Sequence, residues 1–243
     1  MTGGWTNEAA IERWGSMPRD VLERMDPDGD FAKRHLLNPV LLQVLGDVRG
    51  RHVLDAGCGQ GYFSRMLAAR GARVVGVEPG RSLFDHCVER EAQLRQGIRY
   101  VRADLSDHLD LGPPFDACVA SMVLGAVPDW RRAMRSCVEA LAPGGLFVFT
   151  LNHPCFEQLW PVWREHRHYR VSEYLQEYEI TGPHATDFHR PLSAYLNEVS
   201  SLGCRLRSVA EPALDAAVAA TGPEGIEAYV HLPNFVVVAA ERG

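Results

Sequence analysis

Three glycines, each separated from the next by one residue, follow a short apolar run in the first third of the chain. His52–Ala56 has the composition of a buried parallel strand, and Gly57, Gly59 and Gly61 come directly after it. Glycine lacks the Cβ atom that keeps a ligand away from the backbone. Apolar residues recur at helical spacing from Tyr62 onward, so a helix N-terminus is expected to face the ligand. The pattern predicts a nucleotide-type binding loop at the carboxyl end of a strand.

Two acidic residues near this loop narrow the class of ligand. Asp55 lies two residues before the first glycine, where a fixed negative charge would oppose a pyrophosphate and favour a cation. Glu78 ends the second predicted strand and follows Gly57 by 21 residues, at the place where an acidic side chain accepts ribose hydroxyls. The glycine spacing is G-x-G-x-G, whereas a nicotinamide-binding loop has G-x-G-x-x-G. These residues predict a positively charged ligand that contains a ribose.

The motifs resemble those of the class I S-adenosylmethionine-dependent methyltransferases. In order along the chain, the similar segments are residues 53–61, 74–78, 102–105, 114–121 and 140–149. A weaker similarity in residues 152–156 and 189–195 is to a small-molecule branch that includes quinone-pathway and natural-product enzymes. The resemblance implies an α/β fold with a doubly wound, mostly parallel seven-stranded sheet in the order 3-2-1-4-5-7-6. It also implies S-adenosyl-L-methionine as the cofactor.

The resemblance assigns roles at the cofactor site. The carboxylate before the loop and the loop itself would hold the amino-acid end, Glu78 the ribose, and Asp104 with Leu105 the adenine. Each carboxylate could instead only stabilise a turn. Asp30 is interpreted as a helix cap, with a contact to the amino-acid end as the alternative. The expected cofactor contacts are Asp55, Ala56, Gly57, Gly59, Gly61, Tyr62, Glu78, Pro79, Ala103, Asp104, Leu105 and Ser121.

His153 is the candidate catalytic residue because it directly follows the fifth predicted strand, at the rim expected to bind substrate. A histidine, with an ordinary pKa of about 6.5, can accept the proton of an attacking phenol at neutral pH. Its alternative role is that of a hydrogen-bonded structural histidine. For the tryptophans, core packing is the alternative to substrate binding. The expected substrate contacts are Trp14, His153, Trp160, Trp163, Tyr169 and His189. The histidines form no recognisable metal-ligand set, so no metal is predicted.

Strands and helices alternate after residue 50, which predicts a parallel sheet covered on both faces. Strands are expected at 52–56, 73–77, 98–101, 115–120, 145–151, 205–211 and 234–240, and helices near 60–70, 80–94, 129–141 and 191–202. Residues 1–48 are expected to form an N-terminal helical lid that includes a helix opened by Asn38 as N-cap and Pro39. Residues 49–243 are expected to form the methyltransferase domain, with an aromatic-rich substrate insert at 153–190.

Composition excludes several partners. The net charge is −6 and no cluster of basic residues is present, which argues against nucleic acid as a partner. No apolar run reaches the roughly 20 residues that cross a bilayer, and no signal peptide is recognisable. The six cysteines include no C-x-x-C pair and resemble core residues of a reduced protein. We therefore expect a cytoplasmic protein without membrane contact. The oligomeric state is left open, a homodimer included.

The expected function is transfer of a methyl group from S-adenosylmethionine to an oxygen, nitrogen or carbon nucleophile of a small organic acceptor, aromatic or otherwise apolar. Two alternatives stay open. One is an S-adenosylmethionine-binding protein with a non-methylating role, such as a cyclase or a regulatory subunit, because a fold does not fix the chemistry. The other is a nicotinamide-dependent oxidoreductase, which the glycine spacing disfavours.

Overall fold

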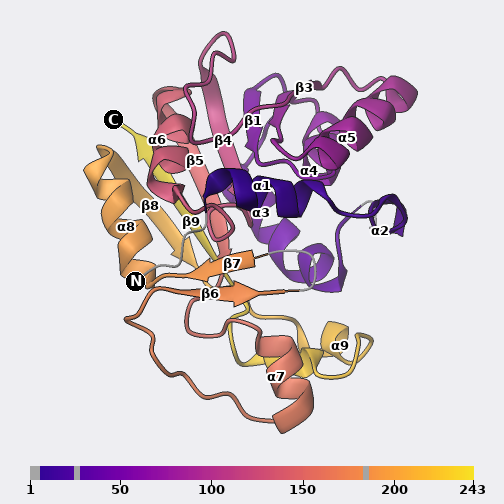
Figure 1. Cartoon of the computed structure of the whole chain (residues 1–243), viewed down its shortest axis with the longest axis vertical. Helices are drawn as coiled ribbons and strands as arrows, with labels where there is room; N and C mark the ends of the chain where they lie inside the picture. The colour runs from indigo at the N-terminus through magenta and orange to yellow at the C-terminus, as the bar shows by residue number, and fades with distance from the viewer. Residues whose placement is uncertain (1–5, 25–27, 183–185) are drawn as a thin grey trace.

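The computed structural model describes residues 6–24, 28–182 and 186–243. Its main sheet has the strand order β3-β2-β1-β4-β5-β9-β8, while β6 and β7 form a separate hairpin (Figure 1). Numbered along the chain, the seven strands of the main sheet therefore have the expected order 3-2-1-4-5-7-6. The first five are parallel, and β9 is antiparallel to both β5 and β8. The predicted doubly wound α/β fold is confirmed.

The structure fixes the bounds of the elements. The strands are β1 (His52–Ala56), β2 (Arg73–Val77), β3 (Arg99–Val101), β4 (Phe115–Ser121), β5 (Leu141–Asn152), β6 (Tyr178–Thr181), β7 (Thr186–His189), β8 (Cys204–Ala210) and β9 (Phe235–Arg242). The helices are α1 (Asn7–Gly15), α2 (Arg19–Arg24), α3 (Asn38–Leu45), α4 (Tyr62–Ala68), α5 (Arg81–Leu94), α6 (Trp130–Glu139), α7 (Leu159–His166), α8 (Leu192–Ser201) and α9 (Ala216–Ala219). A π-helical segment, η1 (Lys33–Leu37), precedes α3, and a 3-10 segment, η2 (Ile226–Val230), precedes β9.

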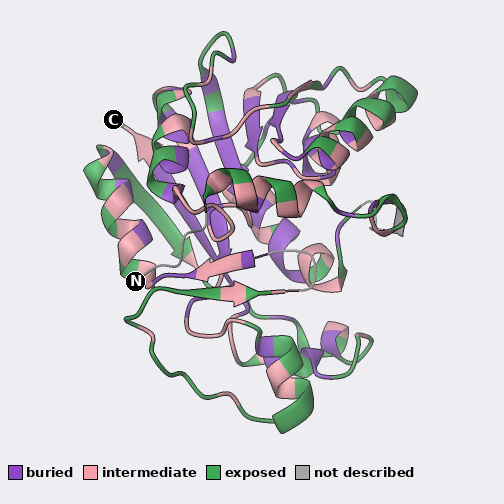
Figure 2. Cartoon of the chain, in the orientation of Figure 1, coloured by how far each residue is buried: buried purple, intermediate pink, exposed green. Residues whose placement is uncertain are grey.

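Alternate residues of the central strands pack against two different helical layers. On one face, Leu54 and Phe149 pack in a cluster with Trp130 of α6. On the other face, Val53 packs in a cluster with Phe63 of α4. The central strands are consequently buried on both sides, whereas the outer surfaces of α5, α7 and α8 are exposed (Figure 2). Burial on both faces explains why these strands read as continuous apolar runs.

The fifth strand begins earlier than predicted. Leu141 already pairs with Phe115 of β4, and the register then shifts so that Leu146 pairs with Ala117. Gly144, with φ +76°, lies in the irregular stretch between these pairs. The Pro143-Gly144-Gly145 sequence, which lies at the start of the predicted strand 145–151, is thus part of a bulge inside the observed strand.

Helix α3 begins at Asn38 as predicted, but the predicted role of Asn38 as its N-cap is wrong. The segment η1 runs directly into α3, so Asn38 has helical angles and its backbone N–H donates to the carbonyl of Lys33. A residue already inside a helix cannot act as its N-cap. The Asn38 side chain instead donates to the carbonyl of Asp28 at 2.8 Å and accepts from the Tyr62 hydroxyl at 3.2 Å. It therefore joins the N-terminal segment to α4.

Two groups of elements lie outside the layers of the main sheet. Helix α1 reaches the ends of β2 and β3, because Asn7 contacts Asp104 and the Ser82 hydroxyl donates to the carbonyl of Gly15 at 2.7 Å. In Figure 1 the β6–β7 hairpin lies below α1, and α7 lies below the hairpin, at the opposite end from α5. The hairpin is held to the loop after β4 by a hydrogen bond from the Phe188 N–H to the Gly125 carbonyl. In the described ranges, no helix is both long and apolar enough to cross a membrane.

Candidate functional site

A cavity of about 410 Å³, here called the main cavity, lies at the ends of β1, β2 and β4 and is covered by α1. Eight of the predicted cofactor residues line it: Gly57, Gly59, Tyr62, Glu78, Pro79, Asp104, Leu105 and Ser121. Four others do not line it: Asp55, Ala56, Gly61 and Ala103. The structure thus brings the three sequence motifs to one site, while some predicted contacts lie behind its wall.

The glycine loop forms the floor of the main cavity. Gly57 has φ +71°, and a Cβ atom on it would lie 2.6 Å from the side chain of Val123. Gly59 has φ +57°, and no atom of the described structure lies within 4 Å of its Cβ position. Both backbone conformations favour glycine. The first glycine permits close packing of the loop after β4, and the second leaves space for a ligand.

Glu78 is held by the loop that it faces. Its Oε2 accepts from the backbone N–H of Gly59 at 3.0 Å, and its Oε1 accepts from that of Gly80 at 2.7 Å. Burial raises the pKa of Glu78 to about 7, although the two N–H donors oppose this rise. Each carboxylate oxygen retains a lone pair. The carboxylate can therefore accept further hydrogen bonds from hydroxyl groups in the cavity, which fits a ribose.

Asp104 joins the cavity wall to helix α1. Its Oδ1 accepts from the backbone N–H of Ser106 at 2.9 Å, and its Oδ2 accepts from the Asn7 amide at 3.2 Å. The same amide donates to the Ser106 hydroxyl at 2.6 Å, and its oxygen accepts from the backbone N–H of Asp129 at 2.9 Å. Asn7 is thus a polar latch between α1, the loop after β3 and the start of α6.

Asp55 lies behind the glycine loop rather than in the cavity. It is 1% exposed, and its Oδ2 accepts from the Ser64 hydroxyl of α4 at 2.5 Å. Burial raises its pKa to about 6, while the hydrogen bonds with Ser64 oppose this rise. Asp55 therefore does not line the cavity in which a ligand contact was predicted for it. The carboxylate instead fixes α4 against β1 and acts electrostatically on the loop residues in front of it, Tyr62 and Glu78 among them.

The charged groups that line the main cavity are mostly acidic. Asp30, Glu78 and Asp104 line it together with Lys33, whose Nζ lies 3.5 Å from Asp30. Asp30 also accepts from the backbone N–H of Lys33 at 2.9 Å, the capping contact expected for it. Such a lining opposes a pyrophosphate and suits a cationic ligand. In addition, the buried Nε1 of Trp14, which also lines the cavity, has no hydrogen-bond partner within the described residues and can donate to a ligand.

Sequence reasoning missed most of the lid and the loop after β4. In α1, the cavity-lining residues are Asn7, Ala10, Ile11 and Trp14, which follow one face of the helix. The helical spacing of these four residues is visible in the sequence, but it does not indicate which part of the protein this face of α1 covers. The missed loop residues are Met122, Val123, Ala126, Val127 and Pro128. Their apolar character carried no signal that separates a cavity wall from ordinary core.

His153 does not reach the main cavity. It is 5% exposed, its Nε2 lies 2.7 Å from Oε1 of Glu211, and its Nδ1 accepts from the backbone N–H of Cys155 at 3.1 Å. Since an N–H donor faces Nδ1, the hydrogen on a neutral ring lies on Nε2 and points to Glu211. Both ring nitrogens are therefore engaged within the protein. The geometry corresponds to the structural histidine that the sequence left as the alternative, and it gives the predicted base role no support.

The aromatic residues predicted to bind substrate also lie elsewhere, with Trp14 as the exception. Trp160 donates to the carbonyl of Glu224 at 2.8 Å, and Trp163 donates to Oε1 of Glu227 at 3.3 Å, so both pack α7 against the segment that begins η2. Tyr169 donates to the carbonyl of Glu157 at 2.5 Å. None of these three side chains lines the main cavity, and their polar atoms instead make hydrogen bonds that hold the insert together.

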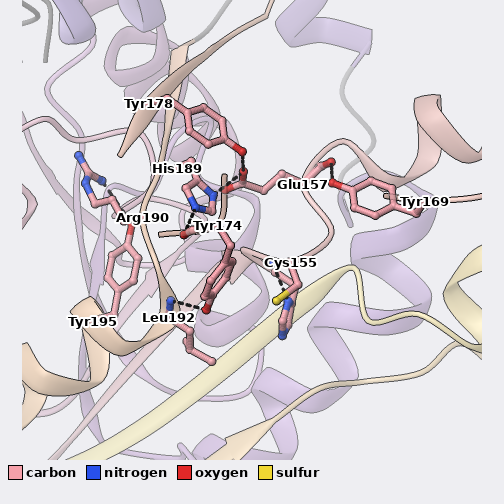
Figure 3. A network of polar contacts seen from close by, with 10 residues as sticks. Cys155, Glu157, Tyr169, Tyr174, Tyr178, His189, Arg190, Leu192 and Tyr195 are labelled. Carbon is pink, nitrogen blue, oxygen red and sulfur yellow. Dashed lines mark hydrogen bonds and ion pairs between the residues drawn. The ribbon is translucent and has the colours of Figure 1, made fainter. Parts of the chain in front are cut away.

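His189 is likewise absent from the main cavity. It is 1% exposed, with Nδ1 2.8 Å from Oε2 of Glu157 and Nε2 2.8 Å from the carbonyl of Tyr174 (Figure 3). The ring of Tyr178 stacks on it at 4.5 Å between centroids. His189 is therefore the centre of a polar network in the insert rather than a residue that contacts a ligand directly.

The fold and the site define a class of protein: a doubly wound α/β protein whose acidic, glycine-floored cavity suits a positively charged nucleoside. The sequence model of the family described as "Methyltransferase domain" matches residues 31–180, which is more than half of the chain. The chain belongs to this family.

Individual relatives agree with this membership. A ubiquinone biosynthesis O-methyltransferase of Coxiella burnetii is 36% identical over 131 residues, which cover 52% of this chain and 56% of that protein. The chain thus spans a little over half of the length of such curated relatives. A solved S-adenosylmethionine-dependent methyltransferase of Mesorhizobium loti is 30% identical with a TM-score of 0.73, covering 89% of this chain and 100% of that one. The cyclase SpnF shares the fold, with 18% identity and a TM-score of 0.59 over 85% of this chain and 80% of its own.

Proposed function

We propose that this protein binds S-adenosyl-L-methionine in the main cavity and transfers its methyl group to an oxygen, nitrogen or carbon nucleophile of a small organic acceptor. The observation that carries the proposal is the arrangement of Glu78 and Asp104 around one cavity whose floor is Gly59. Two separated acceptor groups and an open glycine match the hydroxyls and the amine of an adenosine. The acidic lining matches the positive charge of the sulfonium.

Each part of the cavity has a role in this proposal. Glu78 accepts the ribose hydroxyls, and Asp104 accepts the adenine amine beside Leu105. The loop from Gly57 to Gly59 and the end of β4 at Ser121 bind the amino-acid end. Bound in this way, the cofactor supplies a methyl group already activated by the adjacent positive sulfur. The protein must then hold the acceptor in line with that methyl group and exclude water.

Residues 1–48 act as the lid in this proposal, and residues 49–243 as the catalytic domain with the insert at 153–190. Asn7 is the residue that fastens the lid to the domain. The partner is a small molecule, and neither nucleic acid nor a membrane is required. The six cysteines are free, which fits a reducing compartment, and we place the protein in the cytoplasm.

The test is mass spectrometry of the purified protein, followed by an acceptor screen that measures S-adenosylhomocysteine. We expect S-adenosylmethionine or S-adenosylhomocysteine to copurify, and S-adenosylhomocysteine to form with a suitable acceptor. Conversion of an added substrate without S-adenosylhomocysteine would assign a non-methylating role such as that of a cyclase. Stabilisation by a nicotinamide dinucleotide, and not by S-adenosylmethionine, would assign an oxidoreductase.

A further inference from the structure

A second cavity of about 60 Å³ lies between the end of β5, the β6–β7 hairpin and the loop after β4. Met122 lines both this second cavity and the main cavity. Its backbone has φ +61°, and its N–H donates to the Thr150 hydroxyl at 3.0 Å. A methionine side chain is unbranched and flexible. One movable side chain therefore lies between the two cavities.

Several polar side chains line the second cavity without a hydrogen bond to the described parts of the protein. Asn152, Gln158 and Asp187 all line it, and none of the three side chains makes a hydrogen bond or ion pair within residues 6–24, 28–182 and 186–243. Asn152 and Asp187 are half-buried and Gln158 is exposed, so their polar atoms are accessible and can bind a ligand group. A small polar ligand group in this cavity would satisfy them, and the volume accommodates a group the size of a few water molecules.

The carboxylate of Glu157 is held in position by residues that lie outside the second cavity. His189 Nε2 faces the carbonyl of Tyr174 and must therefore carry a hydrogen. The contact of 2.8 Å between His189 Nδ1 and Glu157 Oε2 then requires a further proton between these two atoms. Figure 3 shows this chain of contacts, with Tyr178 donating to the same oxygen at 3.4 Å. Oε1 of Glu157 has no hydrogen bond within the described parts of the chain, and Glu157 lines the second cavity.

The second cavity holds balanced charges. Arg190 is 4% exposed and lines it, and its guanidinium donates to the carbonyls of Leu124 and Val127, both at 3.1 Å. Its charge lowers the pKa of Asp187, which burial raises. Arg190 offsets the negative charge of Asp187, and His189 offsets that of Glu157, so the charges around the cavity compensate one another. Such a site favours a neutral hydrogen-bond donor over an ion.

We propose that the second cavity binds the hydrogen-bond-donating end of the methyl acceptor, a neutral hydroxyl or amine, and that Glu157 is the catalytic base that takes its proton. This inference rests on the proposed methyl transfer. The acceptor's oxygen or nitrogen forms a bond to the methyl carbon, the methyl–sulfur bond breaks with its electron pair left on sulfur, and the acceptor's proton passes to the Glu157 carboxylate. His189 is a positioning residue, because it holds Oε2 and leaves Oε1 to the cavity.

The surroundings of Glu157 suit it to this task. Burial raises its pKa above the ordinary value, which makes the carboxylate a stronger base, and His189 opposes that rise by favouring the charged form. The other groups that face it are Tyr178 from β6, which also favours the charged form, and Asp187 from β7, which disfavours it. The Tyr169 hydroxyl donates to its backbone carbonyl rather than to the carboxylate.

Binding is tested with phenol, and with toluene as the matched molecule that lacks the hydroxyl. In ¹⁵N NMR spectra of the protein loaded with S-adenosylhomocysteine, phenol should shift the side-chain amide signals of Asn152 and Gln158, whereas toluene should not. Equal responses to both molecules, or no response to either, would overturn the second cavity as the acceptor site. Failure of S-adenosylhomocysteine itself to bind would instead overturn the proposed function.

The base role is tested with Glu157→Gln, and with Glu177→Gln as the control, since Glu177 is an exposed glutamate of the same insert that lines neither cavity. With phenol as acceptor, Glu157→Gln should form anisole at least about 10²-fold more slowly and lose the rise of rate with pH, while its affinity for S-adenosylhomocysteine is unchanged. His189→Gln should move that rise to higher pH, because the cation that favours ionised Glu157 is gone. A Glu157→Gln protein with the control's rate and pH profile would refute the role, as would wild-type protein that binds phenol and forms no anisole.

Discussion

Glu78 at the end of β2 accepts a hydrogen bond of 3.0 Å from the backbone N–H of Gly59, in the loop after β1. One carboxylate oxygen thereby sets the position of the glycine loop, while the other is held by Gly80. The two sequence motifs are therefore joined in one structural unit, and a change at Glu78 also affects the backbone of the glycine loop.

Removal of this carboxylate should weaken cofactor binding more than its own contact suggests. We expect Glu78→Ala to lower the affinity for S-adenosylhomocysteine by about 10- to 100-fold, because the hydroxyl contacts and the loop position are lost together. Isothermal titration calorimetry measures this, with Asp85→Asn on the exposed side of α5 as the control. Normal affinity in Glu78→Ala would contradict our placement of the ribose.

Cofactor affinity should depend on pH through the same residue. The pKa of Glu78 is raised to about 7 without ligand, and a ribose and a cation favour its ionised form. Below pH 7 the proton must leave on binding, so affinity should rise by about tenfold between pH 6 and pH 8 and then level off. Calorimetry across this range measures the effect, which Glu78→Gln should abolish.

The same raised pKa predicts the pH dependence of stability without ligand. Between the ordinary value of 4.5 and about 7, the folded protein binds more protons at Glu78 than the unfolded chain does. The free energy of unfolding should therefore fall as pH rises through this window. Urea denaturation of wild-type protein and Glu78→Gln would show it as a difference in slope, and identical slopes would contradict the assignment.

Gly57 can be tested against a glycine that shares its conformation but not its contacts. A Cβ atom at position 57 would lie 2.6 Å from the rigid side chain of Val123, whereas Gly97, with φ +79°, has no atom within 4 Å of its Cβ position in the described structure. Gly97→Ala should cost only the backbone strain, about 1 kcal/mol of unfolding free energy. Gly57→Ala should cost about 1–3 kcal/mol more and weaken cofactor binding. Equal free energies of unfolding for the two variants would show that the loop after β4 moves to accommodate the added methyl group.

The latch at Asn7 should control opening of the lid. Asn7→Ala removes its contacts with Asp104, Ser106 and the N–H of Asp129, so the amides of α1 should exchange with deuterium faster than in the wild type. We expect cofactor dissociation to accelerate by about tenfold, since contacts of this kind contribute about 1 kcal/mol. Glu8→Ala, at an exposed position one residue along α1, is the control. Unchanged exchange would show that packing of the apolar face of α1, and not Asn7, keeps the lid closed.

His153→Gln separates the structural role from the catalytic one. The histidine is buried between Glu211 and the backbone of Cys155, so its replacement should lower the free energy of unfolding by about 1–3 kcal/mol. The rate of methyl transfer by the folded protein should stay near the wild-type value. A large loss of rate at full stability would restore His153 as the base.

The sequence determined the central sheet and the glycine loop that forms the floor of the main cavity, because their signals are local. The strand and helix patterns around residues 52–94 each depend on neighbours a few positions away, and the glycines of the loop need their conformations whatever surrounds them. Gly57 and Glu78 follow the two strands of one strand–helix–strand unit, and the length of this unit sets their separation in sequence. Such a unit has a right-handed connection, so both residues necessarily meet at one edge of the sheet.

Tertiary structure alone decided how the lid and the insert contribute. Asn7 and Asp104 are 97 residues apart in sequence, and no local pattern pairs them. The histidines show the same limit: His153 and His189 both lie in the insert, yet their ring nitrogens are engaged by Glu211 and Glu157, 58 and 32 residues away. A titratable side chain takes its role from the charges and hydrogen-bond partners around it, and those partners come together only when the whole chain has folded.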